Sequence, residues 1–254
     1  MDAGKTTVGS ALVRILEEKS GASFAIKPRS NYRWHAYAED WVDWNYSDDL
    51  MSCSDTMQLN AHSTLFSHHD VELAAPCQFI SSSGWKYCLF LRCGSKKTNN
   101  RQLFLSNQSA TELSRSSFGE DCYPFDVENF NKTRKLDFGW NSSHTRTSPY
   151  IESSVSQILD RKPQNLVFEG AGPKVPTWRK DHLMKNIVVV SNFTVHVFQN
   201  VNLVVRNASD RLTNLKDLTP LFRSACRKSG RMRFVEPDSR NEEAYSTLKK
   251  LLDL

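Results

Sequence analysis

The 254-residue sequence predicts an α/β fold with a mostly parallel, doubly wound sheet. A Gly-Lys-Thr triplet at residues 4–6 stands directly before an amphipathic helical pattern. Short apolar segments then alternate with further helical patterns, and the segment 165–169 ends in the acid Glu169. We expect one domain over residues 1–254. Its functional groups should gather at the carboxyl ends of the strands, where open α/β sheets bind ligands.

Two elements are expected near the start of the chain. Apolar residues recur at helical spacing over residues 6–19, and a Ser-Gly pair follows as a stop signal. Residues 23–27 are a short apolar run that Pro28 ends, which is typical of a buried parallel strand.

The middle of the chain has a weaker pattern. Tryptophans and tyrosines crowd residues 30–50, where we expect most of them to pack on the sheet edge. The stretches beyond them predict a helix over 51–66, a hairpin with strands 86–92 and 102–105, a polar loop over 107–148 with room for one helix, and a helix over 150–160.

The last third alternates most clearly between apolar runs and helical patterns. It predicts strands at 165–169, 187–190, 201–205 and 232–235, and helices at 212–228 and 242–252. Strands that alternate with helices favour the parallel, doubly wound arrangement.

Composition and charge argue against several classes of protein. The net charge of +5 is spread over scattered lysines and arginines, so nucleic-acid binding is not indicated. No two of the six cysteines have the C-x-x-C spacing of a structural zinc site. We find neither a signal peptide pattern nor an apolar run of about 18 residues that could span a membrane. We therefore expect a cytoplasmic protein without a membrane or nucleic-acid partner.

Residues 4–6 match the second half of the phosphate-binding motif G-x-x-x-x-G-K-[ST]. In that motif backbone N–H groups face the phosphates, the lysine, here Lys5, reaches the terminal phosphates, and the hydroxyl of Thr6 binds Mg²⁺. The first glycine of the motif would fall two positions before Met1. We therefore expect further residues upstream, with the strand that feeds the loop, and weak ATP binding without them. The alternative is a surface helix capped by Asp2.

A magnesium site beside such a loop also needs a carboxylate at the end of a neighbouring strand. Glu169 ends an apolar run, and Gly170 after it lets the backbone approach a phosphate. The alternative is an acidic strand end before an ordinary glycine turn.

Six segments, in the same order along the chain, resemble the dethiobiotin synthetase family. They are Lys27-Pro28, Ser54 to Leu59, Ala75 to Phe79, Ser148 to Tyr150, Phe168 to Pro173 with Pro176, and Val205 to Asn207. The resemblance covers roughly residues 1–80 and 148–240. It implies a three-layer P-loop NTPase fold whose first strand is missing from this chain.

The resemblance implies a Mg-ATP-dependent enzyme that phosphorylates or activates a carboxylate or carbamate on an unidentified small molecule. Lys5 and Lys27 would neutralise the charge of the phosphate and the carbamate. Thr6, Asp55 and Glu169 would hold Mg²⁺. Asp2, Gly4, Thr7 and Gly170 would lie in or beside the phosphate loop, and Asn207 would read the base. The partner would be the small-molecule substrate, and a homodimer is left open.

Two departures from the family lie where its substrate would bind. Residues 80–147 replace a short link, and larger residues follow Lys27-Pro28, up to Trp34. Trp34 is shared with uncharacterised archaeal P-loop ATPases, which look closer still. Two alternatives therefore stay open: an ATPase that acts as a nucleotide-dependent switch or partner-binding protein, and an inactive truncated chain.

Overall fold

The computed structural model describes residues 4–33, 54–81, 88–106, 134–136, 143–170, 174–175, 183–191, 194–204, 213–214, 226–232 and 240–253. Helices and several sheets form a mixed α/β structure, which confirms the predicted class. The chain divides into two compact units. The first unit holds residues 1–26, 58–66 and 161–254, and the second holds residues 27–57 and 67–160.

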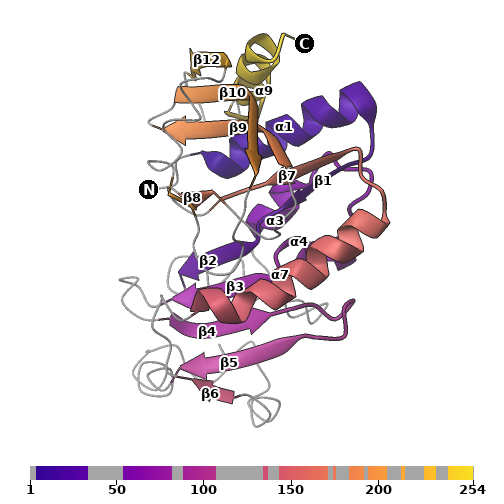
Figure 1. Cartoon of the computed structure of the whole chain (residues 1–254), viewed down its shortest axis with the longest axis vertical. Coiled ribbons are helices and arrows are strands. Elements are labelled where there is room, and N and C mark those ends of the chain that lie inside the picture. Colours follow the sequence, from indigo (N-terminus) through magenta and orange to yellow (C-terminus); the bar gives the residue numbers. More distant parts are fainter. Residues whose placement is uncertain are drawn as a thin grey trace. The chain divides into compact units, whose positions relative to one another are not determined.

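The first unit is built on helix α1 (Lys5–Ser20), which confirms the predicted helix over 6–19. Gly4 precedes it with a left-handed backbone, and Gly21 follows its last residue. Its apolar face packs with helix α9 (Arg240–Leu251) and strand β10 (Thr194–Val204), which lie beside it in Figure 1. The shared core contains Val8, Ala11, Ile15, Val195, Val197, Met232, Ala244 and Leu248.

Two parallel strands of the first unit match the prediction. Strand β1 (Ser23–Ile26) pairs in parallel with β7 (Asn165–Phe168), so that Ile26 lies opposite Phe168. The fully buried amide of Asn60 pairs with the backbone of Ala25, accepting at 2.8 Å and donating at 3.0 Å. Asn60 follows α3 (Ser54–Leu59), a helix much shorter than the predicted 51–66.

The rest of the first unit differs from the predicted parallel arrangement. Strands β9 (Leu183–Ser191), β10 and β12 (Cys226–Arg231) form an antiparallel sheet in the order β12-β10-β9. Only two residues separate β9 from β10, too few for the crossover that parallel strands need. Strands β8 (Lys174–Val175) and β11 (Thr213–Asn214) also pair antiparallel.

The helix predicted over 212–228 is wrong where the structure describes it, because residues 213–214 and 226–228 are in strands. In β12 the side chains of Arg227 and Arg231 are exposed, while Gly230 lies under α9. This alternation has the period of two that a strand requires. The closing helix predicted over 242–252 is confirmed as α9.

The second unit holds a mixed sheet in the order β2-β3-β4-β5-β6. The outer pairs β2–β3 and β5–β6 are parallel, whereas β3–β4 and β4–β5 are antiparallel. The predicted hairpin is confirmed as β4 and β5. The bounds are β2 (Arg29–Arg33), β3 (Cys77–Ser81), β4 (Cys88–Cys93), β5 (Gln102–Ser106) and β6 (Arg134–Leu136).

Helical segments among the described residues accompany this sheet. Helix α7 (Ser143–Asp160) starts seven residues before the predicted 150–160 and contains Pro149. It contacts β3 and the short helix α4 (Val71–Ala74), which follows η2 (His68–Asp70). Figure 1 shows α7 running across β3 and β4.

Several predictions lie outside the described residues. These are the aromatic residues from Trp34 onward, most of the polar stretch 107–148, and the strand predicted at 232–235 apart from its first residue. Among the described helices, none is long and apolar enough to cross a membrane.

Candidate functional site

Two oxygen-bearing side chains from distant parts of the sequence meet in the first unit. The hydroxyl of Thr6 donates to the carboxylate of Glu169, with Oγ1 3.1 Å from Oε2 and 3.3 Å from Oε1. Both residues are buried, Thr6 with 3% and Glu169 with 8% of its surface exposed. The structure therefore brings together two of the three predicted magnesium ligands, which lie 163 residues apart in the sequence.

Local structure explains how the two residues reach each other. Glu169 directly follows β7, and its N–H donates to the carbonyl of Ile26 at the end of β1, at 2.8 Å. This bond extends the parallel pairing by one residue and puts Glu169 at the carboxyl ends of both strands. Thr6 stands in the first turn of α1, which begins at Lys5 after the left-handed turn at Gly4 (φ 72°, ψ 20°).

The start of α1 suits an anion. A helix N-terminus carries partial positive charge, and the first turn of α1 holds no acidic residue. Gly4 supplies no side-chain cap, and a Cβ built on it would meet no described atom within 4 Å. The half-buried Lys5 adds a cation at the same turn. Backbone donors beside open space, with a lysine, are what a phosphate group requires.

The donor set of the Thr6–Glu169 pair fits Mg²⁺. This ion prefers oxygen ligands, keeps several waters and takes only one or two carboxylates from a protein. Adjacent ligands on one Mg²⁺ lie about 2.9 Å apart, since each bond measures about 2.0–2.1 Å. The separation of 3.1 Å between Thr6 and Glu169 is close to that spacing. Among the described residues no group of three or more His, Cys, Asp or Glu could hold a metal ion.

Lys27 and Asp55, for which the sequence predicted separate roles, form an ion pair within the second unit. Nζ of Lys27 lies 2.6 Å from Oδ2 of Asp55, and their side chains are 13% and 40% exposed. The N–H of Lys27 also donates to the carbonyl of Ala74 at 2.8 Å. The third predicted magnesium ligand is thus partnered by the lysine predicted to bind the acceptor, so a substitution of either residue will affect both.

For the other predicted nucleotide-binding residues, the structure describes no contact that bears on their predicted roles. Asp2 and Asn207 lie outside the described residues. Thr7 in α1 and Gly170 after Glu169 are both partly exposed in the first unit. Their roles beside a nucleotide stay predictions.

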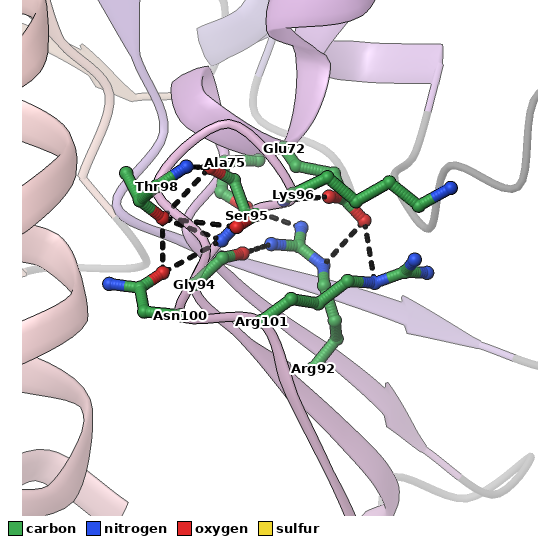
Figure 2. Close-up of polar contacts among 9 residues, drawn as sticks. All are labelled: Glu72, Ala75, Arg92, Gly94, Ser95, Lys96, Thr98, Asn100 and Arg101. Carbon is green, nitrogen blue, oxygen red and sulfur yellow. Dashed lines mark hydrogen bonds and ion pairs between the residues drawn. The ribbon is translucent and has the colours of Figure 1, made fainter. Parts of the chain in front are cut away.

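The sequence interpretation missed a buried charged cluster in the second unit. We call it the Arg92 cluster, and it consists of Glu72, Arg92, Arg101 and the hairpin loop 94–100 (Figure 2). Arg92 and Glu72 are each 1% exposed. Oε1 of Glu72 lies 3.8 Å from Nε of Arg92 and 3.2 Å from Nε of Arg101. Burial lowers the pKa of Arg92, and the charge of Glu72 opposes that shift.

The guanidinium of Arg92 also holds the backbone around it. Its Nη1 donates to the carbonyl of Gly94, and its Nη2 donates to the carbonyl of Ala75. A signal was present in the sequence, because an arginine near the end of the apolar strand Cys88–Cys93 needs a buried partner if both faces of that strand are covered.

Comparison with protein-family models, with curated proteins and with solved structures finds no match to this chain. The resemblance to dethiobiotin synthetase therefore rests on the motif residues alone. The contact between Thr6 and Glu169 is independent of that resemblance, since it comes from the geometry of the chain.

Proposed function

We propose that this chain binds Mg-ATP at the start of α1, on a three-layer P-loop NTPase fold. It is then a dethiobiotin-synthetase-like enzyme that phosphorylates or activates a carboxylate or carbamate on a small molecule. The observation that carries the proposal is the buried contact between Thr6 and Glu169. A hydroxyl at the first turn of a helix and a carboxylate at a strand end are the two oxygen ligands that a magnesium nucleotide needs from the protein.

Each group of the proposed site would have a separate role in phosphoryl transfer. Bound Mg²⁺ would neutralise charge on the phosphate oxygens, with Thr6 and Glu169 as its protein ligands. The backbone N–H groups at the start of α1 orient the phosphates, and Lys5 attracts the oxygens on which charge develops. Catalysis of this kind consists mostly of positioning and electrostatic stabilisation, so no nucleophile from the protein is needed.

From the resemblance to dethiobiotin synthetase we assign Lys27 the acceptor side of the reaction. Its ammonium follows the end of β1, and Pro28 after it prevents the chain from continuing as a helix. A carboxylate or carbamate would exchange with Asp55 as the partner of this ammonium. An anionic small molecule is therefore the substrate class that the pair supports.

ATP turnover by single variants tests the proposal. Lys5→Ala and Glu169→Gln should each lower kcat by about 100-fold or more, as expected for lost charge stabilisation at the phosphates. Glu152→Gln is the control, since Glu152 is exposed on α7. Full turnover in Glu169→Gln would contradict the metal role. Normal turnover of Lys27→Ala with every acceptor tried would remove the acceptor step and favour a nucleotide-dependent switch.

A further inference from the structure

The Arg92 cluster fastens the hairpin of β4 and β5 to the end of helix α4. Glu72 in α4 faces Arg92 and Arg101, and its Oε2 accepts the N–H of Lys96 from the hairpin loop at 3.0 Å. Figure 2 shows this carboxylate enclosed between the two guanidinium groups and the loop. A carboxylate that accepts one hydrogen bond from the hairpin loop and forms ion pairs with two arginines of the hairpin fixes that hairpin against the helix that carries it.

The loop itself has little freedom to move away. Gly94 has a left-handed backbone (φ 75°), and its N–H donates to the carbonyl of Pro76 at 2.8 Å. The N–H of Ser95 donates to Thr98 and to Asn100, each at 3.2 Å. The hairpin is therefore a stiff support for the guanidinium of Arg92.

The backbone of Lys27 is hydrogen-bonded to the same end of α4. Its N–H donates to the carbonyl of Ala74, and the next carbonyl along the chain, that of Ala75, accepts from Arg92. Ala74 and Ala75 are both fully buried. Two consecutive carbonyls thus join the backbone of Lys27 on one side to the Arg92 guanidinium on the other.

We propose that Arg92 is a positioning residue for the ion pair of Lys27 and Asp55. By holding Ala75 and Glu72, it fixes the segment to which Lys27 is bound, and thereby the place of the Lys27 ammonium. The inference rests on the proposed function only in taking that ammonium as the group that meets an anionic acceptor.

The chemistry of the cluster favours positioning over stabilisation alone. A buried ion pair seldom stabilises a fold more than apolar side chains of the same volume. A guanidinium, in contrast, donates from a rigid fork. Arg92 donates to two carbonyls and forms an ion pair with the carboxylate of Glu72. Such a group defines orientation, which an apolar side chain cannot do.

Chemical labelling of the Lys27 amine tests the inference without reference to catalysis. Reductive methylation of the full chain is followed by mass spectrometry in wild type, Arg92→Lys, Asp55→Asn and Lys96→Met, with the exposed Lys19 as internal reference. Asp55→Asn shows the rate without the ion pair. Lys96→Met is the matched control, because Lys96 joins Glu72 through a backbone N–H that the substitution retains.

In Arg92→Lys the labelling rate of Lys27 should rise about threefold relative to Lys19, as expected for a weakened ion pair. Lys96→Met should leave it unchanged. The kcat for Mg-ATP hydrolysis should fall about tenfold or more in Arg92→Lys, with KM for ATP within about twofold of wild type, because misplaced groups lose rate rather than nucleotide affinity. An unchanged Lys27 rate in Arg92→Lys, with the circular dichroism of wild type, would overturn the inference.

Native-state hydrogen exchange of the wild type gives a second measurement that needs no variant. The amides of Lys27 and Gly94 should open together, with equal protection at every denaturant concentration, if one rigid segment holds both. Independent opening would overturn the inference even if Arg92→Lys failed to fold. A wild type that labels as expected but neither binds nor hydrolyses ATP would leave the positioning intact and remove the proposed function instead.

Discussion

Glu169 and Glu72 are both buried carboxylates, but they differ in the partners that the fold gives them. Glu169 accepts a hydrogen bond from the hydroxyl of Thr6, whereas Glu72 faces the guanidinium groups of Arg92 and Arg101. A hydroxyl oxygen has lone pairs, so it can coordinate a cation together with a carboxylate. A guanidinium has none to offer, so it can only compensate the charge within the protein.

The two carboxylates also differ in the space around a glycine close to their partners. Gly4 starts the helix of Thr6 beside open space among the described residues, while a Cβ on Gly94 would lie within 3.0 Å of Asn100. Among the described residues, Gly4 has space beside donors that suit a phosphate, whereas Gly94 is closed in by a loop whose charged neighbours satisfy one another. Burial of a carboxylate alone therefore does not indicate a function, whereas the chemistry of its partner does.

The largest expected effect separates the two carboxylates by stability. Glu72→Gln should lower the free energy of unfolding by about 3–5 kcal/mol, because it leaves two guanidinium groups without their counter-charge in the interior. Glu169→Gln should change it by less than about 1 kcal/mol, since an amide oxygen still accepts from Thr6. Urea denaturation of both variants measures the difference. Equal losses would end the distinction between a structural and a ligand-binding carboxylate.

A pair of glycine substitutions sharpens the contrast between open and closed surroundings. Gly4→Ala should lower the free energy of unfolding by about 1–2 kcal/mol, because alanine is strained in the left-handed backbone of Gly4. Gly94→Ala should cost about 1–3 kcal/mol more, because its Cβ also overpacks against Asn100. Thermal unfolding of the two variants gives the difference. A loss at Gly4 as large as that at Gly94 would show that the start of α1 is not open.

The smallest expected effect is a response to pH in the first unit. Burial lowers the pKa of His196, and the nearby charge of Arg227 lowers it further, with Nδ1 3.2 Å from the guanidinium. A histidine whose pKa is lower in the folded than in the unfolded state stabilises above the ordinary value of about 6.5, and that stability is lost as the pH falls.

His196→Gln should therefore flatten the decline in unfolding free energy between about pH 7.5 and about pH 5.5. A profile that keeps its slope in His196→Gln would contradict this prediction.

The success of the sequence prediction depended on how local the signals were. Helix α1 and strands β1 and β7 carry their own periodicity and stop signals, so the meeting of Thr6 with Glu169 could be expected from parallel strands. The Val-rich runs in β9 and β10 looked the same as parallel strands, because apolar content does not encode direction. What decides the direction of these two strands is the link of only two residues between β9 and β10, which is too short for a parallel crossover.

The Arg92 cluster could not be predicted by the same means. The partners of Arg92 come from α4 and from the hairpin loop, and a sequence does not show which distant segment will bury an arginine. The pairing of Lys27 with Asp55 was missed for a similar reason. Each has a local motif context, but a sequence does not show that two residues 28 positions apart will form an ion pair.

The metal role of Glu169 is tested by the effect of Mg²⁺ on ATP affinity, measured by isothermal titration calorimetry of the wild type and of Glu169→Gln. Wild type should bind ATP about tenfold or more tightly with Mg²⁺ than with chelator, which corresponds to about 1.4 kcal/mol from the added metal contacts. Glu169→Gln should bind ATP with the same affinity under both conditions, at the level of wild type in chelator. Mg²⁺ dependence that persists in full in Glu169→Gln, or a wild type whose affinity ignores Mg²⁺, would contradict the account.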